Sequence, residues 1–146
     1  MKYQTLGTSF EQEVVPGELD LVVPFTTPEL TRSAIQGAER LAPGLHAAIR
    51  LIKLQTVPYA TEMSPVHLGF LKEQLESFHS TLPVRPCLLL TRDGERDLER
   101  ALGPESIVVL ASKRRPWRTR TEWTAARLRK TGHRVLLIYP KERQNA

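Results

Sequence analysis

Five short apolar runs recur along the chain, and between them apolar residues return every three or four positions. The runs cover residues 19–25, 46–54, 84–90, 106–111 and 135–139. Continuous runs of this length, rich in Val, Ile and Leu, are typical of parallel strands buried on both faces. The periodic segments between them predict amphipathic helices. This alternation predicts a doubly wound, Rossmann-like α/β fold, an open five-stranded parallel sheet with helices on both faces.

Capping residues mark the starts of the first three helices. The first begins at a Thr cap followed by Pro28, and the second follows Ser64-Pro65. Asp93 is expected to cap the short third helix, whose acidic positions are predicted to form a solvated face: Glu95, Asp97 and Glu99. Pro86 lies within the third strand and favours an edge position, where a missing N–H costs little.

The fourth helix follows a loop rich in Arg and Lys and ends at Gly132. Helical spacing predicts that its core-facing stripe consists of Trp117, Thr121, Thr124 and Leu128. Trp123 and Arg127, four residues apart, are expected to form a cation–π pair on the surface.

Residues 1–18 lack periodicity and are interpreted as an N-terminal extension, with one domain over residues 19–146. The extension is expected to lie along the domain or to be partly mobile. No apolar stretch approaches the roughly 18 residues needed to span a membrane, and no signal-peptide core follows Met1. The single cysteine, Cys87, fits a reducing compartment. We therefore expect a cytoplasmic protein without membrane contact.

Positive charge is concentrated in one segment. Residues 113–134 contain nine Arg and Lys residues and one acid, Glu122, so the segment carries +8 while the whole chain carries +5. A single basic loop and helix indicates a local site or a solvated face, whereas a uniformly basic surface would indicate general attraction to polyanions.

Two strand ends resemble the universal stress protein family, part of the adenine-nucleotide alpha-hydrolase-like superfamily. The first strand of that family ends V-P-V-D-G-S, and residues 23–28 read VPFTTP here. The fourth strand of the family ends in G-x-x-G, nine residues and G-S or G-T. The matching positions here, without a gap, are Ala111, Arg114, Thr124 and Ala125. The resemblance covers residues 19–140 and implies the same sheet.

The resemblance implies ATP as a ligand, but the motif glycines are replaced. Glycines in a phosphate loop permit positive φ and let backbone N–H groups approach the ligand, which side chains at Ala111, Arg114 and Thr124 prevent. Thr26 stands where the family has the acid that meets the adenosine. We therefore expect a divergent member of the family without the ATP site and without a cofactor.

The basic loop is the strongest candidate for a binding site. Guanidinium groups near a helix N-terminus could replace the lost backbone donors and bind a nucleotide or another phosphorylated metabolite. The candidate anion-binding residues are Thr26, Ser112, Lys113, Arg114, Arg115 and Arg118. Two alternatives remain: a solvated turn with Trp117 packed on the core, or nucleic-acid binding through residues 113–130.

No catalytic or metal-ligand motif is found, because the four histidines fall in separate elements and no nucleophile elbow or P-loop occurs. We therefore expect a non-catalytic binding or interaction domain. The last strand is apolar on both faces and is predicted to lie at a sheet edge, which favours a homodimer. The interface candidates are Val135, Leu137 and Tyr139.

Overall fold

The computed structural model describes residues 2–4, 17–56 and 65–141. All strands are parallel, in the order β1-β4-β3-β2-β5-β6. The strands are β1 (Lys2–Gln4), β2 (Leu19–Pro24), β3 (Ala47–Thr56), β4 (Val84–Thr91), β5 (Ile107–Ala111) and β6 (Arg134–Ile138). The predicted five-stranded parallel core is confirmed as β4-β3-β2-β5-β6. The addition is β1, a three-residue strand from the N-terminal extension.

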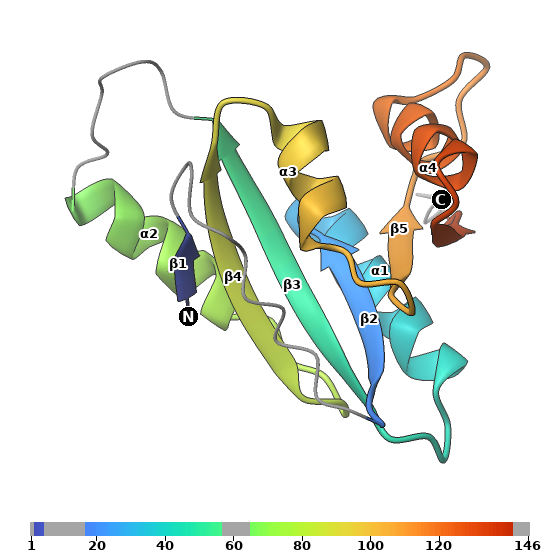
Figure 1. Cartoon of the computed structure of the whole chain (residues 1–146), viewed down its shortest axis with the longest axis horizontal. Helices are drawn as coiled ribbons and strands as arrows, with labels where there is room; N and C mark the ends of the chain where they lie inside the picture. The colour runs from blue at the N-terminus through green and yellow to red at the C-terminus, as the bar shows by residue number, and fades with distance from the viewer. Residues whose placement is uncertain (1, 5–16, 57–64, 142–146) are drawn as a thin grey trace, which may run out of the picture.

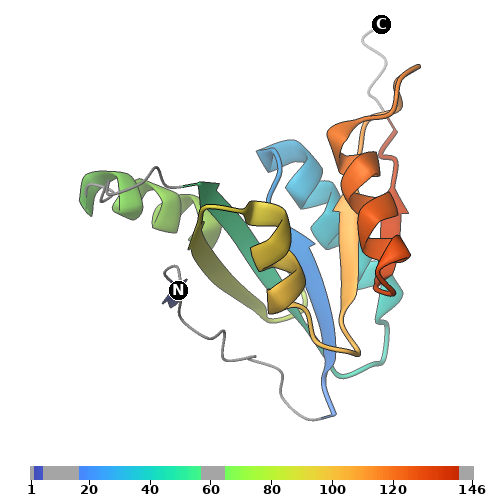
Figure 2. The same cartoon turned by 45° about the horizontal axis from the view of Figure 1, so that its top comes forward.

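Helices cover both faces of the sheet, as predicted (Figures 1 and 2). They are α1 (Pro28–Leu41), α2 (Pro65–Glu76), α3 (Gly94–Ala101) and α4 (Arg120–Lys130). Side chains of α1 and α2 pack in one apolar cluster, and those of α3 and α4 pack in a second cluster on the opposite face. None of the helices in the described ranges is long and apolar enough to cross a membrane.

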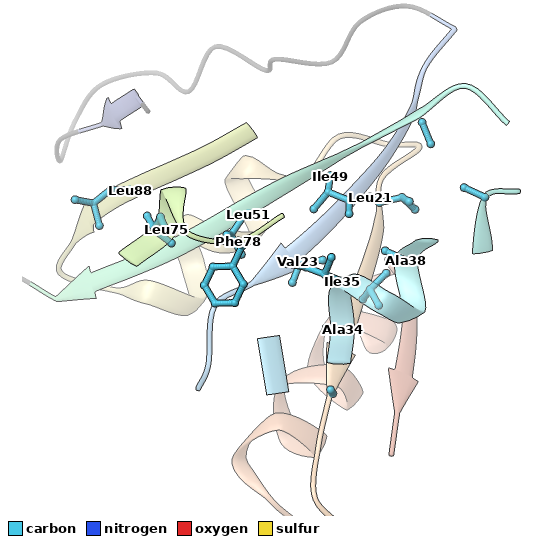
Figure 3. Close-up of a cluster of buried hydrophobic side chains, with 14 of the residues drawn as sticks. Leu21, Val23, Ala34, Ile35, Ala38, Ile49, Leu51, Leu75, Phe78 and Leu88 are labelled. Carbon is cyan, nitrogen blue, oxygen red and sulfur yellow. The ribbon is translucent and has the colours of Figure 1, made fainter. Parts of the chain in front are cut away.

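Alternate residues of each central strand supply the two clusters. Leu21 and Val23 point to the α1 side, together with Ile35 of that helix, whereas Val22 points to the α3 side (Figure 3). All four side chains are buried. Burial on both faces explains why these strands are apolar at consecutive positions.

The caps predicted for α1 and α3 are confirmed. Thr27 accepts a hydrogen bond from the N–H of Leu30 at 3.2 Å, and Asp93 accepts one from the N–H of Arg96 at 3.3 Å. The solvated face predicted for α3 is wrong for Asp97, which is 8% exposed. Its carboxylate accepts a hydrogen bond from the buried hydroxyl of Thr91, a partner on β4 that helical spacing cannot reveal.

The described part of the N-terminal extension lies at the edge opposite β6. Residues Lys2–Gln4 pair with residues 87–89 of β4, so β4 is second from the edge and the position inferred from Pro86 is wrong for the six-stranded sheet. The pairing begins one residue after Pro86, so no ladder bond to described residues of β1 is lost. Residues 1 and 5–16 of the extension lie outside the described residues, as does the predicted Ser64 cap.

Candidate functional site

The winding of the sheet reverses between β2 and β5, which are neighbours in the sheet but far apart in the sequence. In folds of this kind ligands bind outside the carboxyl ends of the strands at such a reversal. The chain leaves β2 toward α1 and leaves β5 toward α4. The loop between β5 and α4, residues 112–119 and hereafter the basic loop, projects beyond the end of the sheet in both views (Figures 1 and 2).

Ser112 anchors the start of the basic loop. Its N–H donates to the carbonyl of Ile138 at 2.9 Å, which extends the ladder between β5 and β6. Its hydroxyl lies 2.7 Å from the hydroxyl of Thr119. Ser112 as a whole is 1% exposed. The predicted ligand residue Ser112 is therefore buried, and its hydroxyl joins the two ends of the loop.

Thr119 and Glu122 form a capping box at the start of α4. The hydroxyl of Thr119 accepts a hydrogen bond from the N–H of Glu122 at 3.2 Å, and the carboxylate of Glu122 accepts one from the N–H of Thr119 at 2.9 Å. The other carboxylate oxygen of Glu122 accepts a hydrogen bond from the hydroxyl of Tyr139 at 2.8 Å. This network ties the start of α4 to the residue that follows β6.

The same contacts shift two pKa values in opposite directions. The hydrogen bond from the Thr119 backbone, followed by the bond from Tyr139, lowers the pKa of Glu122 below its ordinary value of 4.5. The hydrogen bond to the Glu122 carboxylate raises the pKa of Tyr139 above its ordinary value of 10.0. The start of α4 therefore carries a stabilised negative charge supplied by the protein itself.

Two arginines of the basic loop lie over aromatic rings. The guanidinium of Arg114 is 4.5 Å from the ring centroid of Tyr139, and that of Arg118 is 4.7 Å from the ring centroid of Trp123. With Thr119 as the cap, Arg118 and Trp123 occupy the N′ and N4 positions, where an apolar pair commonly fixes the direction in which the chain enters a helix. Here a cation–π pair takes that place.

Several cations of residues 113–134 lie beyond ion-pair distance of every described carboxylate. Within the described ranges, Arg127 pairs with Glu95 of α3, and Arg134 lies 3.8 Å from Glu105. In the same part of the chain, no carboxylate lies within ion-pair distance of several exposed cations: Lys113, Arg114, Arg118, Arg120 and Lys130. Arg115 is exposed as well. The structure thus brings the predicted cationic residues together on one loop.

Both tryptophans lie on the surface, so the predicted core stripe is wrong for Trp117. Trp117 is 66% exposed and Trp123 is 59% exposed, whereas the buried residues of α4 are Ala125 and Leu128. Trp117 precedes the helix cap by two residues, so helical spacing does not govern its direction. The predicted partner of Trp123 is also wrong, because Arg127 binds Glu95 and Arg118 stacks on the indole.

Thr26, the remaining ligand candidate, lies at the end of β2 and is exposed. Its N–H donates to the hydroxyl of the buried Thr31 at 3.1 Å. Nearby on β3, the ammonium of Lys53 lies 4.5 Å from the ring centroid of Phe25, and burial lowers the pKa of Lys53. The sequence pattern does not reveal that this lysine, which lies within β3, is half-buried.

A second polar group missed by sequence reasoning is a buried ion pair in the sheet. Arg50 donates two hydrogen bonds of 2.8 Å to the carboxylate of Asp20 and one of 2.7 Å to the carbonyl of Ala101. Ser106 donates a further bond to Asp20. Asp20 and Ser106 lie at the amino ends of their strands, so this group supports the fold from the end opposite the basic loop.

The predicted interface residues lie on or next to β6, which among the described strands pairs with β5 alone and is therefore an edge strand of the described sheet. Val135, Leu137 and Tyr139 are half-buried. The guanidinium of Arg129 donates to the carbonyl of Val135 at 3.1 Å. The carbonyl of Val135, which points away from β5, therefore already accepts a hydrogen bond from within the domain. The sequence did not reveal this contact.

In the described part of the chain, no group of three or more His, Cys, Asp or Glu residues could hold a metal ion. No family model and no curated protein matches the sequence. Among solved structures, the chain is similar to the universal stress protein UspA from Lactobacillus plantarum, with a TM-score of 0.56, 12% identity and coverage of 82% of this chain and 97% of that one. It is also similar to a macrolide-efflux protein from Streptococcus pneumoniae, with a TM-score of 0.52, 12% identity and coverage of 99% of this chain and 52% of that one. At this identity the likeness shows the fold alone, and the chain has a universal stress protein-like, Rossmann-like α/β fold.

Proposed function

We propose that this domain is a non-catalytic binding module that has lost the ATP site of the universal stress protein family and binds phosphate-containing ligands through the basic loop. The observation that carries the proposal is the contrast between the two ends of that loop. Among the described residues no carboxylate lies within ion-pair distance of Lys113, Arg114 or Arg118, whereas the helix start behind them is occupied by the carboxylate of Glu122.

The contacts of Glu122 support the loss of ATP. A phosphate at a helix N-terminus is held by the first backbone N–H groups and by the helix dipole. Here the N–H of Thr119 donates to Glu122, and the N–H of Glu122 donates to the hydroxyl of Thr119. A triphosphate would have to displace a carboxylate and overcome its charge. The residues present therefore do not fit the phosphates of ATP.

Side-chain donors support binding of an anion at a different place. Guanidinium groups bind phosphate through two parallel hydrogen bonds, and each charge-assisted bond contributes about 1.5–3 kcal/mol. Arg114 and Arg118 are each oriented by an aromatic ring, which reduces the conformational freedom lost when a ligand binds. Exposed cations placed before a helix N-terminus also oppose the helix dipole, and a bound anion would relieve that opposition.

Calorimetric titration of the full chain with tripolyphosphate tests the proposal. Replacing Arg114, Arg115 and Arg118 with alanine should weaken binding about ten-fold or more and remove its dependence on salt. The matched control removes three exposed cations from α1 and α2 on the opposite face: Arg32, Arg40 and Lys72. Equal losses in the two triple variants would show attraction to net charge alone and would contradict the proposal.

Titration with ATP and Mg²⁺ tests the loss of the family's site. We expect no micromolar binding, and any weak binding should disappear in the triple loop variant. Micromolar affinity that survives the triple variant would place ATP in the crevice between β2 and β5 and would overturn this part of the proposal.

A further inference from the structure

The only two tryptophans of the chain are both exposed and lie six positions apart in the sequence. Trp117 belongs to the basic loop and Trp123 to the first turn of α4, and both are more than half exposed. The residue after Trp117, Arg118, stacks on the ring of Trp123. The two exposed indoles therefore lie within one basic stretch, residues 113–123, hereafter the tryptophan surface.

Packing explains only one of the two rings. Trp123 holds Arg118 at the helix entry, although its 59% exposure leaves much of the indole open. Among the described residues, no hydrogen bond or ring contact engages Trp117, which is 66% exposed. A large aromatic side chain in this position contributes little burial to the fold, although burial is the main contribution that such residues make.

Cations alternate with the aromatic rings along this surface. The order along the chain is Lys113, Arg114, Arg115, Trp117, Arg118, Arg120 and Trp123. The one acid within residues 113–134, Glu122, accepts hydrogen bonds from Thr119 and Tyr139. Proteins that bind single strands combine a cationic path for phosphates with aromatic rings on which bases stack, and stacking contributes about 1–3 kcal/mol per base.

We infer that the tryptophan surface binds single-stranded nucleic acid, with phosphates on the loop cations and bases stacked on Trp117 and Trp123. This inference rests on the proposed function and names the class of ligand. A Trp117 ring packed in the core could not stack on a base, and the observed exposure of Trp117 removes this obstacle. Acidic peptides would satisfy the cations but not the rings, and a duplex keeps its bases stacked within itself.

Fluorescence titration provides a direct test, because all tryptophan emission of the chain comes from this surface. The full chain is titrated with a twelve-nucleotide oligothymidylate and with an abasic strand of the same length and charge. We expect the oligothymidylate to quench the emission and to bind at least about five-fold more tightly, the effect of one stacked base. Equal affinity for the two strands, or binding without quenching, would overturn the inference.

Variants separate stacking from charge. Trp117→Ala should lower affinity for oligothymidylate about five-fold or more and leave affinity for tripolyphosphate unchanged, while Trp123→Phe keeps a ring under Arg118 and should lose less. Phe70→Ala removes an exposed aromatic ring from α2 and serves as the control.

If tripolyphosphate binds at the loop but Trp117→Ala has no effect on oligothymidylate, the proposed function stands and this inference fails. If neither ligand binds, both fail. Equal quenching by polyglutamate would favour an acidic protein partner and would also contradict the inference.

Discussion

A carboxylate oxygen of Glu122 lies 2.9 Å from the backbone nitrogen of Thr119 and accepts its hydrogen bond. The protein's own acid thus occupies a helix start of the kind at which many proteins bind phosphate. A ligand that approaches the carboxyl ends of β2 and β5 meets side-chain cations rather than backbone donors. The proposed loss of the ATP site depends on this hydrogen bond between Glu122 and Thr119.

Glu122 should make stability depend on pH. Because its pKa is lowered in the folded protein, its contribution is fully present above the unfolded pKa and is lost as the pH falls through the folded value. Wild type should therefore exceed Glu122→Gln in free energy of unfolding at pH 7, and the gap should narrow as the pH falls below 4.5. Urea unfolding of both proteins between pH 7 and pH 3 measures the gap. Glu73→Gln, an exposed acid of α2, is the control, and a gap that does not change with pH would contradict the assignment.

Replacing one partner of the buried ion pair between Asp20 and Arg50 should lower the free energy of unfolding. Arg50→Met removes both hydrogen bonds that the guanidinium donates to the buried carboxylate of Asp20, and we expect a loss of about 3–5 kcal/mol in the free energy of unfolding. Combining it with Asp20→Leu should recover part of that loss. Urea unfolding of both single variants and the double variant gives the coupling between them. Strict additivity would contradict a direct interaction.

The exposure of Trp117 leads to a prediction about stability. Trp117→Ala should change the free energy of unfolding by less than about 0.5 kcal/mol, as is usual for surface substitutions. A tryptophan packed on the core would cost about 3–5 kcal/mol when truncated. Thermal and urea unfolding distinguish the two values, and a loss near the larger one would place the indole in the core.

Much of the fold could be predicted from the sequence, because the central strands β2, β3 and β5 are largely buried on both faces and therefore appear as mainly apolar runs. The caps Thr27 and Asp93 were also predictable, since a cap bonds to a backbone N–H three residues along the same chain. The candidate site was only partly predictable. Its cations are visible in the sequence, but Arg127 turns toward Glu95 on another helix. A tertiary contact with Thr91 likewise explains why Asp97 is buried although the sequence pattern predicts a solvated face.

Assembly depends on the edge of β6, for which we propose a two-fold dimer. The carbonyls of Ile138 and Val135 point to Ser112 and Arg129, so alternation directs the N–H of Leu137 outward. Light scattering should give about twice the monomer mass of 16.6 kDa. Leu137→Pro removes that outward donor without removing a bond to β5, and it should shift the mass toward the monomer.

A monodisperse wild-type monomer at micromolar concentration would contradict the dimer. Circular dichroism of Leu137→Pro verifies that the variant is folded, because Leu137 also packs against the second apolar cluster. The described part of the N-terminal extension lies at the opposite edge and does not cover β6.

The most direct test of the proposed function is to locate the anion on the folded protein. Backbone and arginine side-chain resonances can be followed by nuclear magnetic resonance while tripolyphosphate is added at moderate salt. The proposed function predicts saturable shifts confined to residues 113–118 and to the Nε–H groups of Arg114, Arg115 and Arg118. Shifts centred on Thr26 and the crevice between β2 and β5, or weak shifts spread over all basic surfaces, would contradict it.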